Sequence, residues 1–170
     1  PTWAVGVTFH NTYIPNIHQW NGSQSMLSMQ KTYEQKVPAW DRGPHFYLAA
    51  GAPTPANDGI WVMTPPDTIG IHAGECNTSR FGIELVGDFQ KYAQTNSQIR
   101  LLVDVIVVLH NWVGISSAVV NAHRDCMLGR TCPGDAFYRS KQVVIDMINS
   151  QLVNSSPQDI WSEWGTAYPL

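Results

Sequence analysis

The chain has 170 residues, which fits one domain of ordinary size with room for a hydrophobic core. Ten Lys and Arg against 13 Asp and Glu give a formal net charge of −3, so the chain lacks the basic field that holds nucleic acid or anionic lipid. Hydrophobic residues make up 44%, which excludes global disorder. The longest aliphatic run, residues 105–109, is far shorter than the roughly 20 residues of a membrane span. Neither nucleic acid nor a membrane is expected as a partner.

Segments with strand and helix character alternate along the chain, which predicts one α/β domain with a central mixed sheet flanked by helices. The expected elements are a strand at 3–9, a helix at 23–35, hairpin strands at 45–50 and 60–63, a strand at 81–86, a helix at 96–113, a short strand at 118–121 and a helix at 136–152. Thr95 or Ser97 is the expected N-cap of the long helix, and Gly114 its C-cap. We expect a catalytic domain at 1–153 and a tail or linker at 154–170.

One carboxylate stands out within the predicted strand at 81–86. The large side chains of Phe81, Ile83 and Leu85 share one face of this strand because side chains alternate along a strand. Glu84 is therefore expected to point away from them, beside Gly82, which would leave room for a ligand. The alternative is an ordinary solvated strand face.

The cysteine count limits the disulfide chemistry. Three cysteines, Cys76, Cys126 and Cys132, leave at least one thiol unpaired, so the chain is not a small disulfide-stapled fold. The first residues lack the basic and apolar regions of a secretion signal, although a signal could have been removed earlier. The compartment stays open at this point.

Three residues that can bind a metal follow predicted strands or lie in a turn-rich segment. His10 ends the first strand, His123 follows the strand at 118–121, and Cys132 lies in the segment Arg-Thr-Cys-Pro-Gly. Two histidines and one cysteine that leave a fourth position for water are typical of a catalytic zinc, whereas a structural zinc takes four ligands. Spacing alone is weak evidence, because an isolated histidine is more often a hydrogen-bonded structural residue.

Six short motifs occur in an order that strengthens this interpretation. They are His10-Asn11-Thr12, Pro44-His45-Phe46, His72-Ala73-Gly74, Phe81-Gly82-Ile83-Glu84-Leu85, Asn121-Ala122-His123 and Thr131-Cys132-Pro133-Gly134. In this order the chain resembles the type-2 N-acetylmuramoyl-L-alanine amidases, a zinc family that includes phage endolysins and is related to peptidoglycan recognition proteins. The resemblance runs from about residue 5 to 137. It implies a mixed sheet with helices over one face, a zinc cleft on the other, and cleavage of the amide between MurNAc and L-alanine.

The resemblance also implies roles for individual residues. His10, His123 and Cys132 match the ligands of one Zn²⁺ per chain, and Glu84 matches a glutamate that activates or orients the attacking water in part of the family. Such a carboxylate suits general acid–base work. Arg130 stands where the family often has a lysine that helps to stabilise the oxyanion, and it keeps the charge without the geometry. An ordinary surface arginine is the alternative.

One departure from the family concerns Pro44, because several relatives carry a tyrosine at that position. Tyr47 follows three residues later and, by strand alternation, would not replace it unless the register differs. We therefore place more weight on Glu84 and the zinc. His72 is expected to line the cleft and contact substrate, with a ligand-supporting or purely structural role as the alternative.

The remaining aromatic, histidine and cysteine residues receive smaller roles. Tyr13 and Trp61, and with them Trp20 and Trp40, flank the motifs and could offer flat surfaces to sugar rings or the stem peptide, although core packing is the commoner use of aromatics. No chemistry is expected of His18, His45 or His110. Cys126 is a less favoured ligand than Cys132, because Pro-Gly after Cys132 matches the motif better.

The sequence as a whole predicts a zinc-dependent peptidoglycan amidase that acts on the cell wall as a monomer. The alternative is a non-catalytic module that recognises muropeptides, and relatives of that kind typically lack the cysteine ligand. A phage lysin would be made in the host cytoplasm without a signal peptide.

Overall fold

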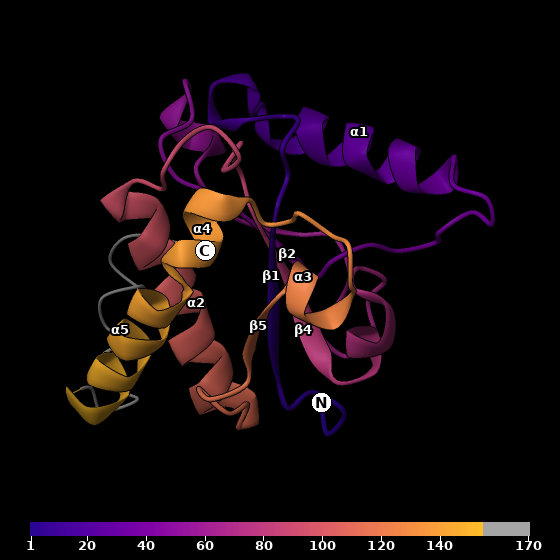
Figure 1. The fold of residues 1–170 in the computed structure, drawn as a ribbon. Coiled ribbons are helices and arrows are strands. Elements are labelled where there is room, and N and C mark those ends of the chain that lie inside the picture. Colours follow the sequence, from indigo (N-terminus) through magenta and orange to yellow (C-terminus); the bar gives the residue numbers. More distant parts are fainter. Residues whose placement is uncertain (155–170) are drawn as a thin grey trace.

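Five strands form one mixed sheet in the order β3-β2-β4-β1-β5 (Figure 1). The computed structural model describes residues 1–154, so all but the first residue of the expected tail at 154–170 lies outside the described residues. The strands are β1 (Gly6–Asn11), β2 (Phe46–Ala49), β3 (Gly59–Val62), β4 (Arg80–Leu85) and β5 (Val120–Ala122). β2, β4, β1 and β5 run parallel to one another, and the edge strand β3 runs antiparallel to β2. The predicted hairpin and mixed sheet are confirmed.

The alternation of side chains gives the sheet two different faces. Val7 and Phe9 of β1 are fully buried in the larger hydrophobic core, and Thr8 and His10 point to the opposite face. Phe81, Ile83 and Leu85 of β4 lie in the same core, so the predicted orientation of Glu84 is confirmed. One face of the sheet therefore carries the core, and the other carries the polar residues.

Two long helices cover the core face. They are α2 (Asn96–Val113) and α5 (Lys141–Asn154), which lie side by side (Figure 1). Helix α2 has the predicted bounds. Its N-cap is Thr95, whose hydroxyl accepts from the Gln98 N–H in a capping box, and Gly114 ends it in the left-handed conformation.

The helix predicted at 136–152 is in fact two helices, so this prediction is wrong in one respect. Helix α4 (Asp135–Arg139) ends at Ser140, and α5 begins at the next residue. The single hydrogen of the Ser140 hydroxyl is shared between two acceptors, the Phe137 carbonyl and Oε1 of Gln94. A serine that bonds to the preceding turn competes with the helical ladder, which accounts for the break.

Helix α1 (Gly22–Glu34) lies on the other side of the sheet from α2 and α5 (Figure 1). A second, smaller hydrophobic cluster lies there, centred on Trp20 and Tyr47 and extended by Trp61 and the methionines of α1. The short helices are η1 (Ile17–Gln19), η2 (Pro55–Asn57), η3 (Gly74–Thr78) and α3 (His123–Cys126). Across residues 1–154, every helix is too short or too polar to cross a membrane.

Candidate metal centre

Three side chains from distant parts of the sequence meet at one end of the sheet. His10 is near the end of β1, His123 begins α3 directly after β5, and Cys132 lies in the loop before α4. β1 and β5 are parallel neighbours, so their carboxyl ends lie together. The Nδ1 atom of His10 is 3.1 Å from Nδ1 of His123 and 3.7 Å from Sγ of Cys132.

These separations match the ligand sphere of a zinc ion. Bonds of about 2.05 Å to nitrogen and about 2.3 Å to sulfur at tetrahedral angles place two nitrogens about 3.3 Å apart and a nitrogen about 3.6 Å from a sulfur. The three ligand atoms all lie within 4.8 Å of one another. Within residues 1–154 this is the one such group of three, and it includes no fourth protein ligand. The donor set therefore fits a metal that keeps an open coordination position.

A second histidine orients His10. The Nε2 atom of His10 lies 3.1 Å from Nδ1 of His72, and Nε2 of His72 lies 3.2 Å from the Arg80 carbonyl oxygen. A carbonyl oxygen only accepts hydrogen bonds, so Nε2 of His72 is protonated and donates to it. Nδ1 of the neutral His72 ring is then an acceptor, and the N–H at Nε2 of His10 donates to it. This arrangement leaves Nδ1 of His10 unprotonated for a metal. Support of a ligating imidazole through its outer nitrogen is the usual pattern at metal sites.

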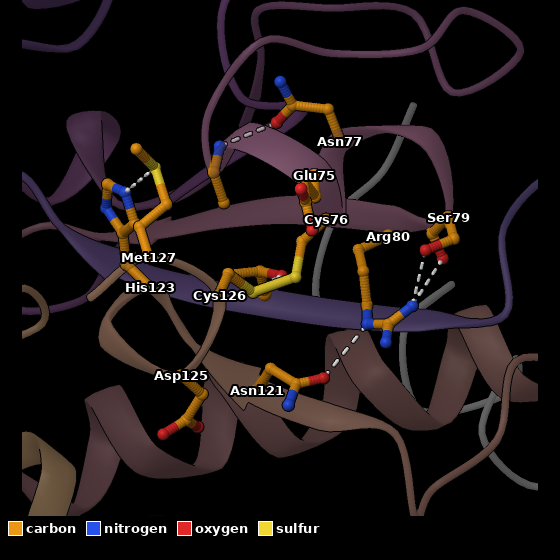
Figure 2. Close-up of a disulfide and its surroundings, with 12 residues drawn as sticks. Glu75, Cys76, Asn77, Ser79, Arg80, Asn121, His123, Asp125, Cys126 and Met127 are labelled. Carbon is orange, nitrogen blue, oxygen red and sulfur yellow. Dashed lines mark hydrogen bonds between the residues drawn. A yellow bond between two sulfur atoms is a disulfide. The ribbon is translucent and has the colours of Figure 1, made fainter.

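His123 is oriented in a similar way. Its Nε2 atom lies 3.4 Å from the Met127 sulfur, one helical turn further on, as Figure 2 shows. With Nε2 as the donor, Nδ1 is left unprotonated, and Nδ1 is the atom that faces His10. Both imidazoles thus present the same nitrogen to the site.

The protonation of these groups follows from their burial. Burial lowers the pKa of His10 well below its usual value, with smaller effects from His72 and His123. Burial also lowers the pKa of His72 to about 3 and that of His123 to about 4. All three are neutral at pH 7, as metal ligands and their partners must be. Burial raises the pKa of the Cys132 thiol to about 12, with a smaller effect from Glu84, and a bound cation would favour its thiolate.

Arg124 holds the Cys132 loop against α3. The Arg124 N–H donates to the Cys132 carbonyl at 3.1 Å, and its guanidinium donates to the Thr131 carbonyl and, at 2.8 Å, to Asp135. Because Arg124 follows His123 directly, it links the backbone next to His123 to the backbone around Cys132. The sequence analysis did not identify Arg124, although its position next to His123 was a usable signal.

The other two cysteines form a disulfide that the sequence analysis did not assign. Cys76 of η3 is bonded to Cys126 of α3 across a sequence separation of 50 (Figure 2). Cys126 is therefore not available as a ligand, and Cys132 is the free thiol. The preference for Cys132 over Cys126 is consistent with this pairing.

Glu84 lies beside the three ligands on the same face of the sheet. In the strand register its Cα is paired with that of His10 on one side and that of Tyr47 on the other. The side chain is 8% exposed, and its Oε2 atom has no hydrogen-bond partner within residues 1–154. Burial raises its pKa to about 8. A carboxyl group held without a partner next to a metal site is suited to exchanging protons with a bound reactant.

A cleft of 460 Å³ opens over this site. It is lined by all three ligand residues, by Glu84 and His72, and by the exposed Arg130. A second cavity of 410 Å³, lined by Tyr13, shares Asn11 and Cys132 with the first, so the two meet at the metal centre. Helix α1 and the loop after it contribute Tyr33, Lys36 and Trp40 to the wall of the cleft. The sequence analysis named Trp40 as a possible substrate contact but did not name Tyr33 or Lys36.

Trp61 and the remaining histidines lie apart from this cleft. The Trp61 indole donates to the Asn57 carbonyl and packs against Trp20, and neither described cavity includes Trp61 among its lining residues. His45, directly before β2, is fully buried; its Nδ1 accepts from the Gly82 N–H, and its Nε2 donates to the Thr68 carbonyl.

Sheet order, cleft and ligand geometry together define an α/β domain with a candidate open metal centre at the carboxyl ends of its parallel strands. The family model described as N-acetylmuramoyl-L-alanine amidase matches residues 5–135. The chain belongs to this family, the type-2 amidases.

Solved structures of similar fold include both amidases and recognition proteins. The amidase LysC from Clostridium intestinale URNW has a TM-score of 0.65 at 21% identity over 85% of this chain and 86% of its own. Drosophila PGRP-LB has a TM-score of 0.68 at 23% identity over 82% of this chain and 81% of its own. The catalytic domain of XlyA has a TM-score of 0.61 at 19% identity over 86% of each chain. No curated protein sequence matches the chain.

Proposed function

We propose that this chain is a zinc-dependent amidase that hydrolyses the bond between N-acetylmuramic acid and L-alanine in peptidoglycan. The observation that carries the proposal is the meeting of His10, His123 and Cys132 at zinc-ligand distances beside the unpaired carboxyl of Glu84. Membership of the amidase family supports the choice of bond. The proposed ligands are the three residues that both the motifs and the geometry select.

A bound zinc would supply a Lewis acid that polarises a carbonyl and lowers the pKa of water to about 7. Glu84 would accept the proton of the attacking water and return it to the nitrogen of the departing L-alanine. The burial that raises its pKa to about 8 suits it to both steps near neutral pH, because the group can hold or release a proton there. Arg130, exposed at the rim of the cleft, would contribute positive charge toward the developing oxyanion.

The two cavities suggest where the substrate lies. The larger one carries the cations Lys36 and Arg130, which suits the carboxylates of a stem peptide. The smaller one is lined by uncharged polar side chains and the ring of Tyr13, which suits a sugar. We assign His72 to orienting His10, since both of its ring nitrogens are engaged, and we give Trp61 a packing role.

The proposed partner is a muropeptide or intact peptidoglycan. A mutant of Drosophila PGRP-LB, a protein of the same fold, was solved in complex with tracheal cytotoxin. We propose that the chain acts at the cell wall as a monomer, with residues 1–153 as the catalytic domain and 154–170 as a tail or linker.

Digestion of purified cell walls tests this function. Zinc-loaded protein is expected to release new N-terminal alanine, measured by amine labelling and by mass spectrometry of the muropeptides, and chelation is expected to abolish the release. His10→Ala should lose activity, whereas His18→Ala, a change to a histidine outside the site, should keep it. Glu84→Gln should retain zinc and lose turnover. Wall binding without alanine release by zinc-loaded protein would contradict the amidase function and support muropeptide recognition.

A further inference from the structure

Two tyrosine hydroxyls meet at the wall of the cleft that Glu84 also lines. Tyr47 of β2 is paired in register with Glu84 and is fully buried. Tyr33 lies in the last turn of α1, and its hydroxyl is hydrogen-bonded to that of Tyr47. Tyr33 is also one of the residues that line the cleft over the metal centre. Helix α1, which lies on one side of the sheet (Figure 1), thus carries a phenol that lines the cleft.

The hydrogen-bond inventory leaves one phenol hydrogen without an acceptor. Each hydroxyl carries one hydrogen. Within residues 1–154, neither hydroxyl makes any hydrogen bond besides the one that joins Tyr33 to Tyr47. Tyr47 has no exposed surface, so the Tyr33 oxygen is the acceptor open to it. If Tyr47 donates to Tyr33, the hydroxyl hydrogen of Tyr33 has no acceptor. Tyr33 is the tyrosine of this pair that lines the cleft, so the free hydrogen is available to a substrate there.

The surroundings keep this phenol protonated. Burial raises the pKa of Tyr33 above its usual value, and the nearby Glu84 carboxyl raises it further. Burial likewise raises the pKa of Tyr47. Tyr33 is therefore a hydrogen-bond donor, and not a base, over the whole range of pH in which proteins work.

The ring of Tyr33 is also held in place. Trp40 stacks on it with a centroid distance of 5.7 Å and an interplanar angle of 26°. Gly43 packs so closely against an edge of the ring that a Cβ there would lie 2.4 Å from Cε2 of Tyr33. The Trp40 N–H donates to the Tyr33 carbonyl at 3.0 Å, which closes the segment over the helix end. A donor fixed in this way needs little reorganisation when charge develops beside it.

We propose that Tyr33 is a further catalytic residue, which donates its hydroxyl hydrogen to the carbonyl oxygen of the scissile amide as that oxygen gains negative charge. Tyr47 is its positioning residue. Pro44 lies on the same cleft and has no donor, so the phenol supplied by α1 provides one on this wall. This inference rests on the proposed amidase function.

Matched phenylalanine variants test the inference, with kcat and KM for alanine release measured on zinc-loaded protein. Tyr33→Phe should lower kcat by about 100- to 1000-fold, the usual loss for one oxyanion donor, with KM changed by less than about threefold. Tyr47→Phe should lower kcat by about tenfold, because the donor remains but loses its fixed partner. Tyr92→Phe, at an exposed site, should leave both constants unchanged. Zinc content should match the wild type in all three variants, and all three should still unfold cooperatively. Tm should fall in Tyr33→Phe and Tyr47→Phe, because each change removes one partner of a buried hydrogen bond. A lower kcat in folded, zinc-loaded protein separates a catalytic loss from misfolding.

Two results would overturn the inference while the proposed function stands. One is a Tyr33→Phe variant whose kcat stays within about threefold of the wild type. The other is a variant whose loss falls entirely on KM, which would make Tyr33 a substrate contact only. If zinc-loaded wild-type protein releases no alanine, the proposed function fails, and the inference fails with it.

Discussion

The backbone of Gly82 lies against the ring of His72, so closely that a Cβ at position 82 would stand 2.6 Å from Cγ of His72. The sequence analysis interpreted Gly82 as room for a ligand. That room is occupied by the histidine that supports His10.

Gly82→Ala is therefore expected to act through His72. The added methyl would push the imidazole away, cost about 1–3 kcal/mol of stability and weaken zinc binding by about 10- to 100-fold. A double-mutant cycle measured by urea denaturation checks the cause, because the cost of Gly82→Ala should largely vanish in a His72→Ala background. If Gly82→Ala costs the same free energy of unfolding in both backgrounds, the methyl group clashes with the backbone of β4 and not with His72.

Arg124→Ala should loosen the loop that carries Cys132. The guanidinium bonds to the Thr131 carbonyl and to Asp135 would be lost, and zinc affinity is expected to fall by about 10- to 100-fold. Competition with a chromophoric chelator measures this affinity. Arg139→Ala, a change to an exposed arginine of α4, is the matched control and should bind zinc as tightly as the wild type. Unchanged affinity in Arg124→Ala would mean that the loop holds its shape without this residue.

The Cys76–Cys126 disulfide is expected to contribute to stability. It joins η3 at the rim of the cleft to α3, which begins with His123 (Figure 2). Closing a loop of 50 residues typically stabilises a protein by about 2–4 kcal/mol. Denaturation with and without reductant measures the effect, and a Cys76→Ser/Cys126→Ser variant should match the reduced wild type. Cys132→Ser should remain as sensitive to reductant as the wild type. Equal stability of the oxidised and reduced forms would contradict the pairing.

Acid is expected to weaken the fold through His45. Burial lowers the pKa of His45 to about 4 from 6.5, so between these values the unfolded chain binds the proton more readily than the folded chain. Stability is thus fully present above pH 6.5 and falls as the pH drops toward 4, by about 1.4 kcal/mol per pH unit for this group.

The variant His45→Gln isolates this contribution from that of the other histidines. Urea denaturation at a series of pH values should show the stability advantage of the wild type over the variant shrinking as the pH falls through the same window. An advantage that is independent of pH would show that His45 does not titrate on unfolding.

The regular elements, and the three residues that meet as candidate metal ligands, could be predicted because the signals for them are local. The long helix has a capping residue at Thr95 and a glycine at its end, and the strand alternation placed Glu84 opposite the core. His10 lies near the end of β1 and His123 directly follows β5, and because these strands are parallel neighbours the topology itself brings the two residues together. The order of the motifs and the chemistry of the side chains were enough to select these residues as candidates.

The residues that support the site could not be predicted in the same way. Tyr33 reaches the cleft because α1 lies over Tyr47, a contact between elements that no local pattern encodes. The pairing of Cys76 with Cys126 depends on η3 lying beside α3. Trp61 flanks a motif in the sequence but packs against Trp20 beneath α1. Each of these three contacts depends on how distant elements pack together, and the order of residues in the sequence does not indicate that packing.

The stoichiometry of zinc on purified protein tests the central claim most directly. Equilibrium dialysis of metal-free protein against zinc, followed by elemental analysis, should give one zinc per chain for the wild type and for His18→Ala. His10→Ala, His123→Ala and Cys132→Ser should each bind zinc far more weakly, because each removes one of the three ligands proposed among residues 1–154. A wild-type chain that binds no zinc, or three ligand variants that all retain it, would contradict the account.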